Sequence, residues 1–282
     1  MRLIRTASQI TAACSNLRAG DRTLGCVPTM GALHDGHASL IRESSSRYDA
    51  TVVSIFVNPT QFGPREDFRR YPRTLRADLR LATRCGADVV FAPAAAEMYP
   101  AGFQTSIEVA DLARRWEGER RPGHFRGVAT VVTTLFNLVR PTHALFGQKD
   151  YQQALIIQQL VRDVRVGMTV RVLPTVREPD GLAMSSRNRY LTPEQRRSAA
   201  SLYRALCDGR QRLTGGARLT GPVIRQMRRL LHGYPQVRID YVAAVDAKTL
   251  RPLARARGRV ALLVAAWVGR TRLIDNLLVD VS

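Results

Sequence analysis

The chain has 282 residues, 45% of them hydrophobic and 23% charged, which fits one large soluble domain or two smaller ones and excludes a mainly disordered or collagen-like chain. No apolar run approaches the roughly 20 residues of a membrane-spanning helix, and the first residues lack the apolar region of a secretory signal, so we expect a cytoplasmic protein without a membrane partner. The formal net charge of +20 suggests a polyanion as partner, but the basic residues are spread along the whole chain, and we expect no nucleic-acid partner.

Strand-like and helix-like segments alternate over the first 175 or so residues. Short apolar runs that end in turns predict strands buried on both faces, and apolar residues at helical spacing predict the helices between them. The strands are expected at 23–28, 51–57, 88–91, 144–146 and 170–173, and the helices at 37–46, 75–85, 125–139 and from about 150 to 164. This alternation predicts an α/β domain with a parallel sheet covered on both faces, whose ligands bind beyond the carboxyl ends of the strands.

The pattern changes after about Thr175. Two helices are expected at 193–212 and 222–231, followed by three strands at 237–245, 260–268 and 271–278. Two helices and an antiparallel meander predict a smaller α+β domain. We therefore divide the chain into domains at residues 1–175 and 176–282.

Two histidines, His34 and His37, flank Gly36 where a predicted strand gives way to a helix. A helix N-terminus offers free backbone N–H groups and the positive end of the helix dipole, both of which suit a phosphate. Imidazoles three positions apart can lie on the same side of the helix and donate hydrogen bonds to charge developing on a leaving phosphate. The alternatives are a pair of surface histidines, or a metal pair, for which no third ligand stands nearby.

Two amide side chains, Asn58 and Gln61, directly follow the strand predicted at 51–57. Amides both donate and accept hydrogen bonds, so they can hold a carboxylate or a hydroxyl without adding charge. A polar turn that contains Pro59 is the alternative interpretation.

The segment Gly147–Gln153 again places a glycine between a predicted strand and a helix. Arginine accounts for 41 of the 43 basic residues, so the retained Lys149 indicates a site that needs an ammonium group, such as a phosphate site. Asp150 suits a helix N-cap or a magnesium ligand. Gln153 shares an otherwise apolar helix face with Ile157, which is unusual for a surface glutamine.

A further polar loop contains Ser185, Ser186 and Arg187, whose hydroxyl and guanidinium groups suit a phosphate. A mobile loop that closes over the phosphates is one interpretation, and an interdomain linker is the other. Additional anion contacts are expected from Arg121, His124 and Arg126.

Together these segments suit a nucleoside triphosphate, although neither a P-loop nor a dinucleotide-binding fingerprint occurs in the sequence. No two of the four cysteines lie at Cys-x-x-Cys spacing, so we expect reduced thiols and no structural zinc site. The residues alone therefore predict nucleotidyl transfer to a small acid or to a phosphate.

Seven segments, in order along nearly the whole chain, resemble the pantothenate synthetase (pantoate–β-alanine ligase) family. They are residues 28–37, 56–62, 71–74, 123–128, 146–153, 177–188 and 272–276. The His-x-Gly-His part alone is shared with many nucleotidyltransferases and class I aminoacyl-tRNA synthetases, whereas the whole set is specific. Gln148 and Pro179 stand where the family carries acidic or variable residues.

The resemblance implies a Rossmann-like domain at 1–175 that binds ATP and pantoate, and an α+β lid or dimer-associated domain at 176–282, in a homodimer that uses Mg²⁺. It implies that ATP and pantoate form pantoyl adenylate and pyrophosphate. β-Alanine then attacks the mixed anhydride to give AMP and pantothenate, the precursor of coenzyme A. Another adenylyl- or cytidylyltransferase, and a basic nucleic-acid-binding protein, are the alternatives; a phosphate acceptor would favour arginine or lysine where this chain has Gln61 and Gln153.

Carried over by position, the resemblance assigns catalysis to His34, His37 and Lys149. It assigns pantoate to Gln61 and Gln153, with Gln61 also facing β-alanine, and it assigns no residue to a metal. The ATP site that it implies consists of Met30, Gly31, Ala32, Leu33, His34, Asp35, Gly36, His37, Gly147, Gln148, Lys149, Asp150, Val176, Met184, Ser185, Ser186 and Arg187.

Overall fold

The computed structural model describes residues 1–64 and 66–282 and divides into two compact units. Unit 1 comprises Met1–Gly147 and Gln152–Pro174, and unit 2 comprises Gln148–Tyr151 and Thr175–Ser282. The short segment Gln148–Tyr151 thus packs with the C-terminal part of the chain, although the residues on both sides of it belong to unit 1. A boundary placed at one point of the sequence cannot express this arrangement.

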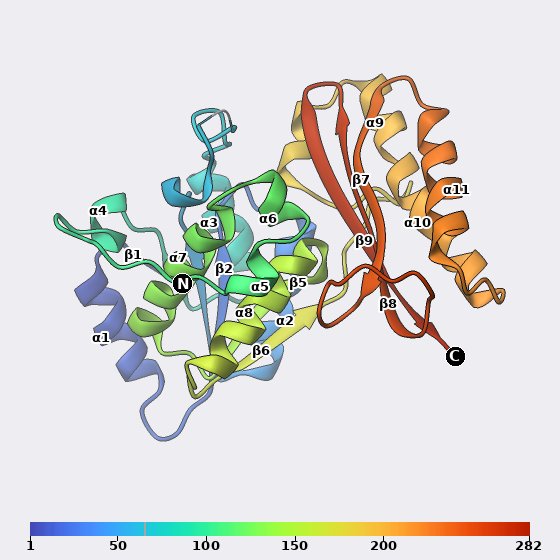
Figure 1. Ribbon diagram of the computed structural model, residues 1–282. Helices are drawn as coiled ribbons and strands as arrows, with labels where there is room; N and C mark the ends of the chain where they lie inside the picture. The colour runs from blue at the N-terminus through green and yellow to red at the C-terminus, as the bar shows by residue number, and fades with distance from the viewer. Residues whose placement is uncertain (65) are drawn as a thin grey trace. The chain divides into compact units, whose positions relative to one another are not determined.

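Unit 1 is built on six parallel strands in the order β1-β4-β3-β2-β5-β6 (Figure 1). Their bounds are β1 Arg2–Ile4, β2 Leu24–Thr29, β3 Ala50–Ile55, β4 Val89–Phe91, β5 His143–Gly147 and β6 Thr169–Leu173. Successive side chains of a strand point to opposite faces, so along β3 Val52 packs in one apolar cluster and Val53 in another. Both residues are fully buried, because both faces of the sheet are covered.

Helices provide this cover. Their bounds are α1 Ala7–Leu17, α2 Asp35–Arg47, α3 Leu75–Arg84, α4 Ala95–Met98, α5 Ala110–Ala113, α6 Glu117–Arg120, α7 His124–Val139 and α8 Tyr151–Asp163. Ile10 of α1 and Leu135 of α7 lie in the cluster of Val52, whereas Ile41 of α2 lies in the cluster of Val53. The chain leaves the carboxyl end of β2 at Thr29 and enters α2 at Asp35.

Unit 2 consists of an antiparallel meander and three helices (Figure 1). Their bounds are α9 Pro193–Ala199, α10 Ser201–Thr214, α11 Thr220–His232, β7 Val237–Asp246, β8 Gly258–Val268 and β9 Thr271–Val281. Leu206 of α10, Met227 of α11 and Leu262 of β8 are fully buried in one apolar cluster. A Cβ atom on Gly209 would lie 2.7 Å from the sulfur of Met227, so this glycine allows α10 and α11 to approach each other.

The predicted fold class is confirmed: a Rossmann-like parallel sheet with helices on both faces is followed by a smaller α+β part. Several details differ from the prediction. The helix expected at 193–212 is interrupted at Ala200, where neither glycine nor proline marks a break. β1, α1 and the short helices α4, α5 and α6 were not expected from the sequence; an element of three or four residues carries too short an apolar pattern to stand out.

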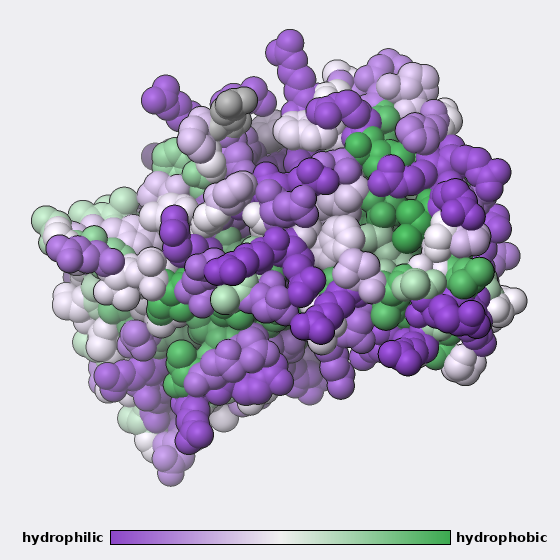
Figure 2. All heavy atoms as spheres, in the orientation of Figure 1, coloured by the Kyte–Doolittle hydropathy of each residue, from purple (hydrophilic) through white to green (hydrophobic). Residues whose placement is uncertain are grey.

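Hydrophilic residues predominate on the face shown in Figure 2, and the hydrophobic surface there is divided into small patches. The large hydrophobic side chains that are exposed are scattered along the chain at Met1, Leu3, Phe103, Val164 and Leu219. Within the ranges 1–64 and 66–282, no helix combines the length and the apolar character needed to cross a membrane.

Candidate active site

His34 and His37 lie at the start of α2 and cap it reciprocally. The Nδ1 atom of His34 accepts a hydrogen bond from the N–H of Gly36 at 3.2 Å, and Nδ1 of His37 accepts from the N–H of His34 at 3.3 Å. The two ring centroids are 4.1 Å apart. A neutral imidazole whose Nδ1 accepts a hydrogen bond carries its proton on Nε2. The backbone therefore sets both rings as Nε2–H donors at the positive end of a helix.

The hydrogen bonds at this turn decide which of its groups can donate to a phosphate. The expectation of free backbone N–H groups is wrong for most of the turn, because intramolecular acceptors already engage these groups. They are the N–H groups of Gly31, Ala32, Leu33, His34, Gly36 and His37. Imidazole Nε2–H groups, rather than the backbone, are then the main donors that this turn can offer to a phosphate.

A buried carboxylate that the sequence analysis missed holds the same turn. Asp78 on α3 is 2% exposed, and its oxygens accept from the N–H of Ala32 at 3.0 Å, the N–H of Leu33 at 2.9 Å and the hydroxyl of Thr74 at 3.1 Å. Ala32 has a φ of +49°, a left-handed conformation that costs a non-glycine residue roughly 1–2 kcal/mol. The two N–H bonds to Asp78 compensate for this strain and keep the turn in one conformation.

The two amide side chains after β3, Asn58 and Gln61, make different contacts. Asn58 is 1% exposed and caps the 3-10 turn Pro59–Gln61; its Nδ2 donates to Gln61 Oε1 at 3.2 Å and to the carbonyl of Gly127 at 3.1 Å. Its Oδ1 accepts from the hydroxyl of Tyr99 at 2.8 Å. Asn58 is thus committed to internal bonds. Gln61 Nε2 lies 2.9 Å from the sulfur of Met30, so the structure brings these two predicted site residues together.

His124 at the start of α7 and the nearby Arg121 support the backbone of Gln61. The imidazole of His124 lies 2.8 Å, through Nδ1, from the carbonyl of Gln61 and 3.0 Å, through Nε2, from Nη1 of Arg121. Burial, and after it the charge of Arg121, lower the pKa of His124 to about 4, so the ring is neutral near pH 7. Because a carbonyl only accepts, Nδ1 carries the proton and Nε2 accepts from Arg121.

Arg121 forms an ion pair with Glu66. Its Nε and Nη2 atoms lie 2.8 and 2.6 Å from the two oxygens of Glu66. This pair lowers the pKa of Glu66, against the effect of burial. The expectation of anion contacts at Arg121 and His124 is therefore replaced by a supporting role for Gln61, whereas Arg126 is exposed.

On α8 the buried glutamine is Gln152, not Gln153. Gln152 is 6% exposed, and its amide donates to the carbonyls of Leu112 and Arg115, both at 2.7 Å, and accepts from the N–H of Glu117 at 3.1 Å. Gln153 is half-buried in the first turn of the helix. The role of Gln152 was not predicted, since nothing in the local pattern shows that a distant loop bonds to its amide.

The predicted phosphate residues of unit 2 lie in two turns. Lys149 and Asp150 belong to the 3-10 turn Gln148–Asp150, where Nζ is 3.5 Å from the Asp150 carboxylate. Ser185 caps the 3-10 turn Ser186–Tyr190 by accepting from the N–H of Arg187 at 3.3 Å. The N–H of Met184 donates to the carbonyl of Val176 at 3.0 Å, which closes the base of this loop. Within the described part of the chain, no group of three or more His, Cys, Asp or Glu side chains could hold a metal ion.

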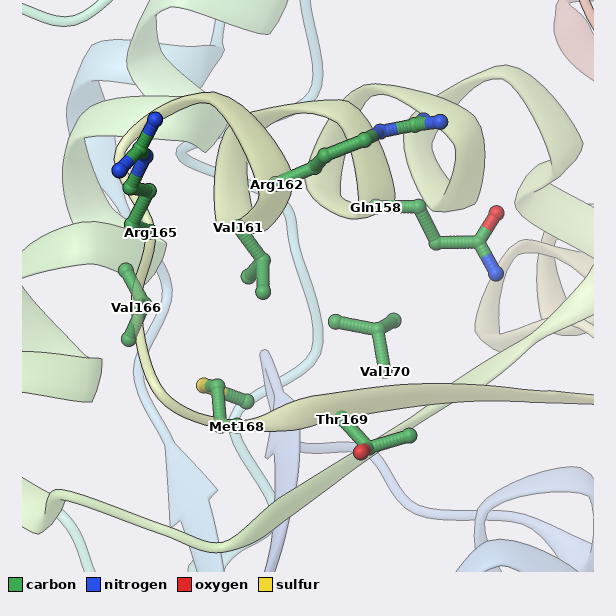
Figure 3. Close-up of a pocket in the computed structure, with 8 residues that line it drawn as sticks. All are labelled: Gln158, Val161, Arg162, Arg165, Val166, Met168, Thr169 and Val170. Atoms are coloured by element: carbon green, nitrogen blue, oxygen red, sulfur yellow. The ribbon is translucent and has the colours of Figure 1, made fainter.

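Two hollows in unit 1 differ in their relation to the sheet. The hollow in Figure 3 has a volume of about 430 Å³ and lies between the last turns of α8 and the start of β6, at the amino end of that strand. It contains none of the predicted site residues. A second hollow of about 290 Å³ includes Met30, Gly31, Ile55 and Asp78 and lies at the carboxyl ends of β2 and β3, where ligands of such sheets bind. We therefore place the candidate site of unit 1 at this second hollow.

The chain is similar to known proteins of one family. A family model described as Pantoate-beta-alanine ligase matches residues 2–278. The chain belongs to the pantoate–β-alanine ligase family. This confirms the resemblance seen in the seven sequence segments.

Relatives from this family match the chain over its whole length. A pantothenate synthetase of Moorella thermoacetica is 53% identical over 282 residues, which is 100% of both chains. A pantothenate synthetase of Myxococcus xanthus is 52% identical over 278 residues, covering 98% of this chain and 95% of the relative.

Solved structures of the same family also match nearly the whole chain. The crystal structure of a pantothenate synthetase from Thermus thermophilus matches with a TM-score of 0.94 and 46% identity, covering 98% of this chain and 99% of that one. A pantoate–β-alanine ligase from Francisella tularensis, complexed with β,γ ATP and β-alanine, matches with a TM-score of 0.82 and 34% identity over 99% of this chain and 97% of that one.

Proposed function

We propose that this chain condenses pantoate with β-alanine to pantothenate, at the expense of ATP, with release of AMP and pyrophosphate. The observation that carries the proposal is the reciprocal capping of α2 by His34 and His37 in a member of the pantoate–β-alanine ligase family. It sets two Nε2–H donors side by side at a helix N-terminus, as a reaction at a phosphate requires. The relative from Francisella tularensis, which binds ATP and β-alanine, supports the choice of substrates.

In the first step, a carboxylate oxygen of pantoate attacks the α-phosphorus of ATP. A P–O bond to pantoate forms, the bond to pyrophosphate breaks, and pantoyl adenylate results. Negative charge grows on the leaving pyrophosphate, and this step depends chiefly on positioning and electrostatic stabilisation. His34, His37 and Lys149 supply that stabilisation, and Ser185, Ser186 and Arg187 complete the phosphate contacts.

In the second step, the amine of β-alanine attacks the carbonyl carbon of the mixed anhydride. A C–N bond forms, the C–O bond to AMP breaks, and the amine releases a proton. Gln61 and Gln153 hold pantoate through uncharged amides, which form hydrogen bonds with its hydroxyl and carbonyl groups. Because the amides carry no charge, they do not compete with the charged groups that react. Asn58 and His124 support this role by holding the side chain and the backbone of Gln61.

The donor set of the chain fits magnesium that arrives with ATP. Mg²⁺ usually binds substrate phosphates together with one or two carboxylates. Asp150, whose carboxylate is half-exposed beside Lys149, is the residue that would hold it. When bound, the ion would neutralise charge on the phosphates. The remaining residues of the ATP site follow the positions that the family resemblance assigns, from Met30 to His37 and from Gly147 to Asp150, with Val176 and Met184.

The family resemblance also supports a homodimer in the cytoplasm, in which residues 1–175 bind ATP and pantoate and residues 176–282 form a lid or dimer-associated domain. Light scattering on the purified protein tests the dimer, because a monomer of 31.4 kDa and its dimer are readily separated.

Product analysis with all three substrates tests the proposed function. We expect pantothenate and AMP in equal amounts, and no ADP. ADP as the product would instead indicate an acyl-phosphate route, and no product with pantoate but turnover of another acid or phosphate would indicate a different nucleotidyltransferase.

A further inference from the structure

The motif Arg272–Asn276 has no role in the reaction described above. Its last residue, however, forms hydrogen bonds with the turn that carries Lys149. Asn276 on β9 is 3% exposed. Its Nδ2 donates to the carbonyls of Gln148 and Lys149, both at 2.9 Å, and its Oδ1 accepts from Nε2 of Gln148 at 3.2 Å. Asn276 thus holds the turn Gln148–Asp150 at two successive carbonyls.

The buried ion pair between Asp275 and Arg177 holds the backbone of Asn276. Asp275 is 4% exposed; it accepts from the N–H of Asn276 at 2.8 Å and from both terminal nitrogens of Arg177 at 2.6 and 2.9 Å. Arg177 also donates to the carbonyl of Asn276 at 3.3 Å, and its guanidinium lies 3.8 Å from the ring centroid of Tyr203. A bidentate pair of this kind fixes direction as well as distance.

The same arginine closes the base of the loop that contains Ser185 and Arg187. Arg177 pairs with Ala183 as an antiparallel bridge and donates to the carbonyl of Gly181 at 3.1 Å. One cluster, Arg177–Asp275–Asn276, therefore contacts both the Lys149 turn and the base of the loop that contains Ser185 and Arg187.

We propose that Asp275 and Asn276 are positioning residues for adenylation: Asn276 fixes the backbone of the Lys149 turn, and Asp275, through Arg177, fixes the base of the Ser185–Arg187 loop relative to it. This inference rests on the proposed function, because it requires that Lys149 contacts the phosphates of ATP. It assigns the Asp-Asn part of the motif to the geometry of the phosphate site, not to substrate contact.

A double-mutant cycle tests the inference. Pantoate-dependent exchange of radiolabelled pyrophosphate into ATP is measured for the wild type, Asn276→Ala, Lys149→Ala and the double variant. We expect Asn276→Ala to slow exchange at least tenfold, and the double variant to be no slower than Lys149→Ala, because Asn276 acts through Lys149. Losses that multiply in the double variant would overturn the inference.

Two further variants separate positioning from folding. Thr220→Val removes another buried side-chain bond of unit 2, to the carbonyl of Leu253, and should lower the thermal midpoint without changing the exchange rate. If Asn276→Ala does not fold, Asn276→Ser, which keeps one donor, takes its place in the cycle with a smaller loss expected. A wild type without pantoate-dependent exchange would overturn the proposed function as well, whereas an active wild type with multiplying losses would overturn only this inference.

Discussion

His34 and His37 each use Nδ1 to accept a backbone N–H at the start of α2, so a single pair of hydrogen bonds both caps the helix and sets the tautomer of the two rings. Capping and chemistry are thus divided between the two nitrogens of each imidazole. Nδ1 serves the fold, and Nε2–H is the group that we assign to chemistry. This division makes the two functions separable by substitution.

His37→Asn and His37→Gln should have opposite effects. The asparagine oxygen can replace Nδ1 as acceptor, so the thermal midpoint should stay near that of the wild type, while the loss of the Nε2–H donor slows adenylation by roughly 10²–10³. Glutamine can also cap the helix from this position, but an amide that reaches the position of Nε2 gives up that bond. His37→Gln should therefore retain more activity and lose about 2–4 °C of thermal midpoint with its cap. Equal activity of the two variants would contradict the assignment of Nε2–H as the working group.

Asp78→Asn should weaken the turn before α2 although it is nearly isosteric. An amide offers one acceptor oxygen, so the N–H of either Ala32 or Leu33 loses its partner. An unsatisfied buried N–H costs about 1–3 kcal/mol of the free energy of unfolding, and displacement of the turn should slow adenylation by about tenfold or more. Denaturant unfolding and single-turnover kinetics measure the two effects.

Thr74→Val is the matched control for Asp78. It removes only the hydroxyl bond to the same carboxylate and leaves both N–H bonds in place. The adenylation rate should stay within about twofold of the wild type, with a stability loss of about 1 kcal/mol. A rate loss as large as that of Asp78→Asn would mean that the carboxylate does not act through the turn.

His124 should make the free energy of unfolding depend on pH, in the window between the pKa of its ring in the folded protein and that in the unfolded chain. The pKa is about 4 in the folded protein against an ordinary value of 6.5, so the unfolded chain binds more protons in this window. The contribution is complete above pH 6.5, falls as the pH drops toward 4, and is constant below; its size is at most about 3 kcal/mol. His124→Asn keeps a donor for the carbonyl of Gln61 but does not titrate. Urea unfolding at several pH values should therefore show a gap between the two proteins that changes only inside the window.

Gly127→Ala should disturb Gln61 through the backbone. A Cβ atom at this position would lie 2.4 Å from the carbonyl oxygen of Thr60 and 2.8 Å from the backbone nitrogen of Gln61, so α7 must move away. Overpacking of this kind typically costs about 1–3 kcal/mol, and the KM for pantoate should rise. Gly167→Ala, where a Cβ would meet no atom within 4 Å, should be neutral or slightly stabilising. A normal KM for pantoate in Gly127→Ala would contradict the role of this contact.

The sequence predicts those parts of the fold and site that depend on local patterns. Continuous apolar runs reveal β2 and β3, because both faces of the parallel sheet are covered, and the His-x-Gly-His spacing at a strand–helix junction reveals the pair His34 and His37.

Residues whose role depends on distant partners could not be predicted in this way. Asp78 bonds to Ala32 across 46 positions, and Asn276 bonds to Gln148 across 128. Neither the helical pattern around Asp78 nor the strand pattern around Asn276 indicates such a partner. The structural role of Gln152 could not be predicted for the same reason, since the loop that it supports lies 35 or more positions before it.

Exchange of radiolabelled pyrophosphate into ATP, with pantoate present and β-alanine absent, tests the central claim most directly. The proposed mechanism predicts exchange that requires pantoate, because pantoyl adenylate forms reversibly before β-alanine binds. Lys149→Ala, with an unchanged thermal midpoint, should lose most of this exchange, since it removes the ammonium from the phosphate site. The absence of exchange in folded wild-type protein supplied with magnesium and pantoate would contradict an adenylate intermediate, and with it the function proposed for this chain.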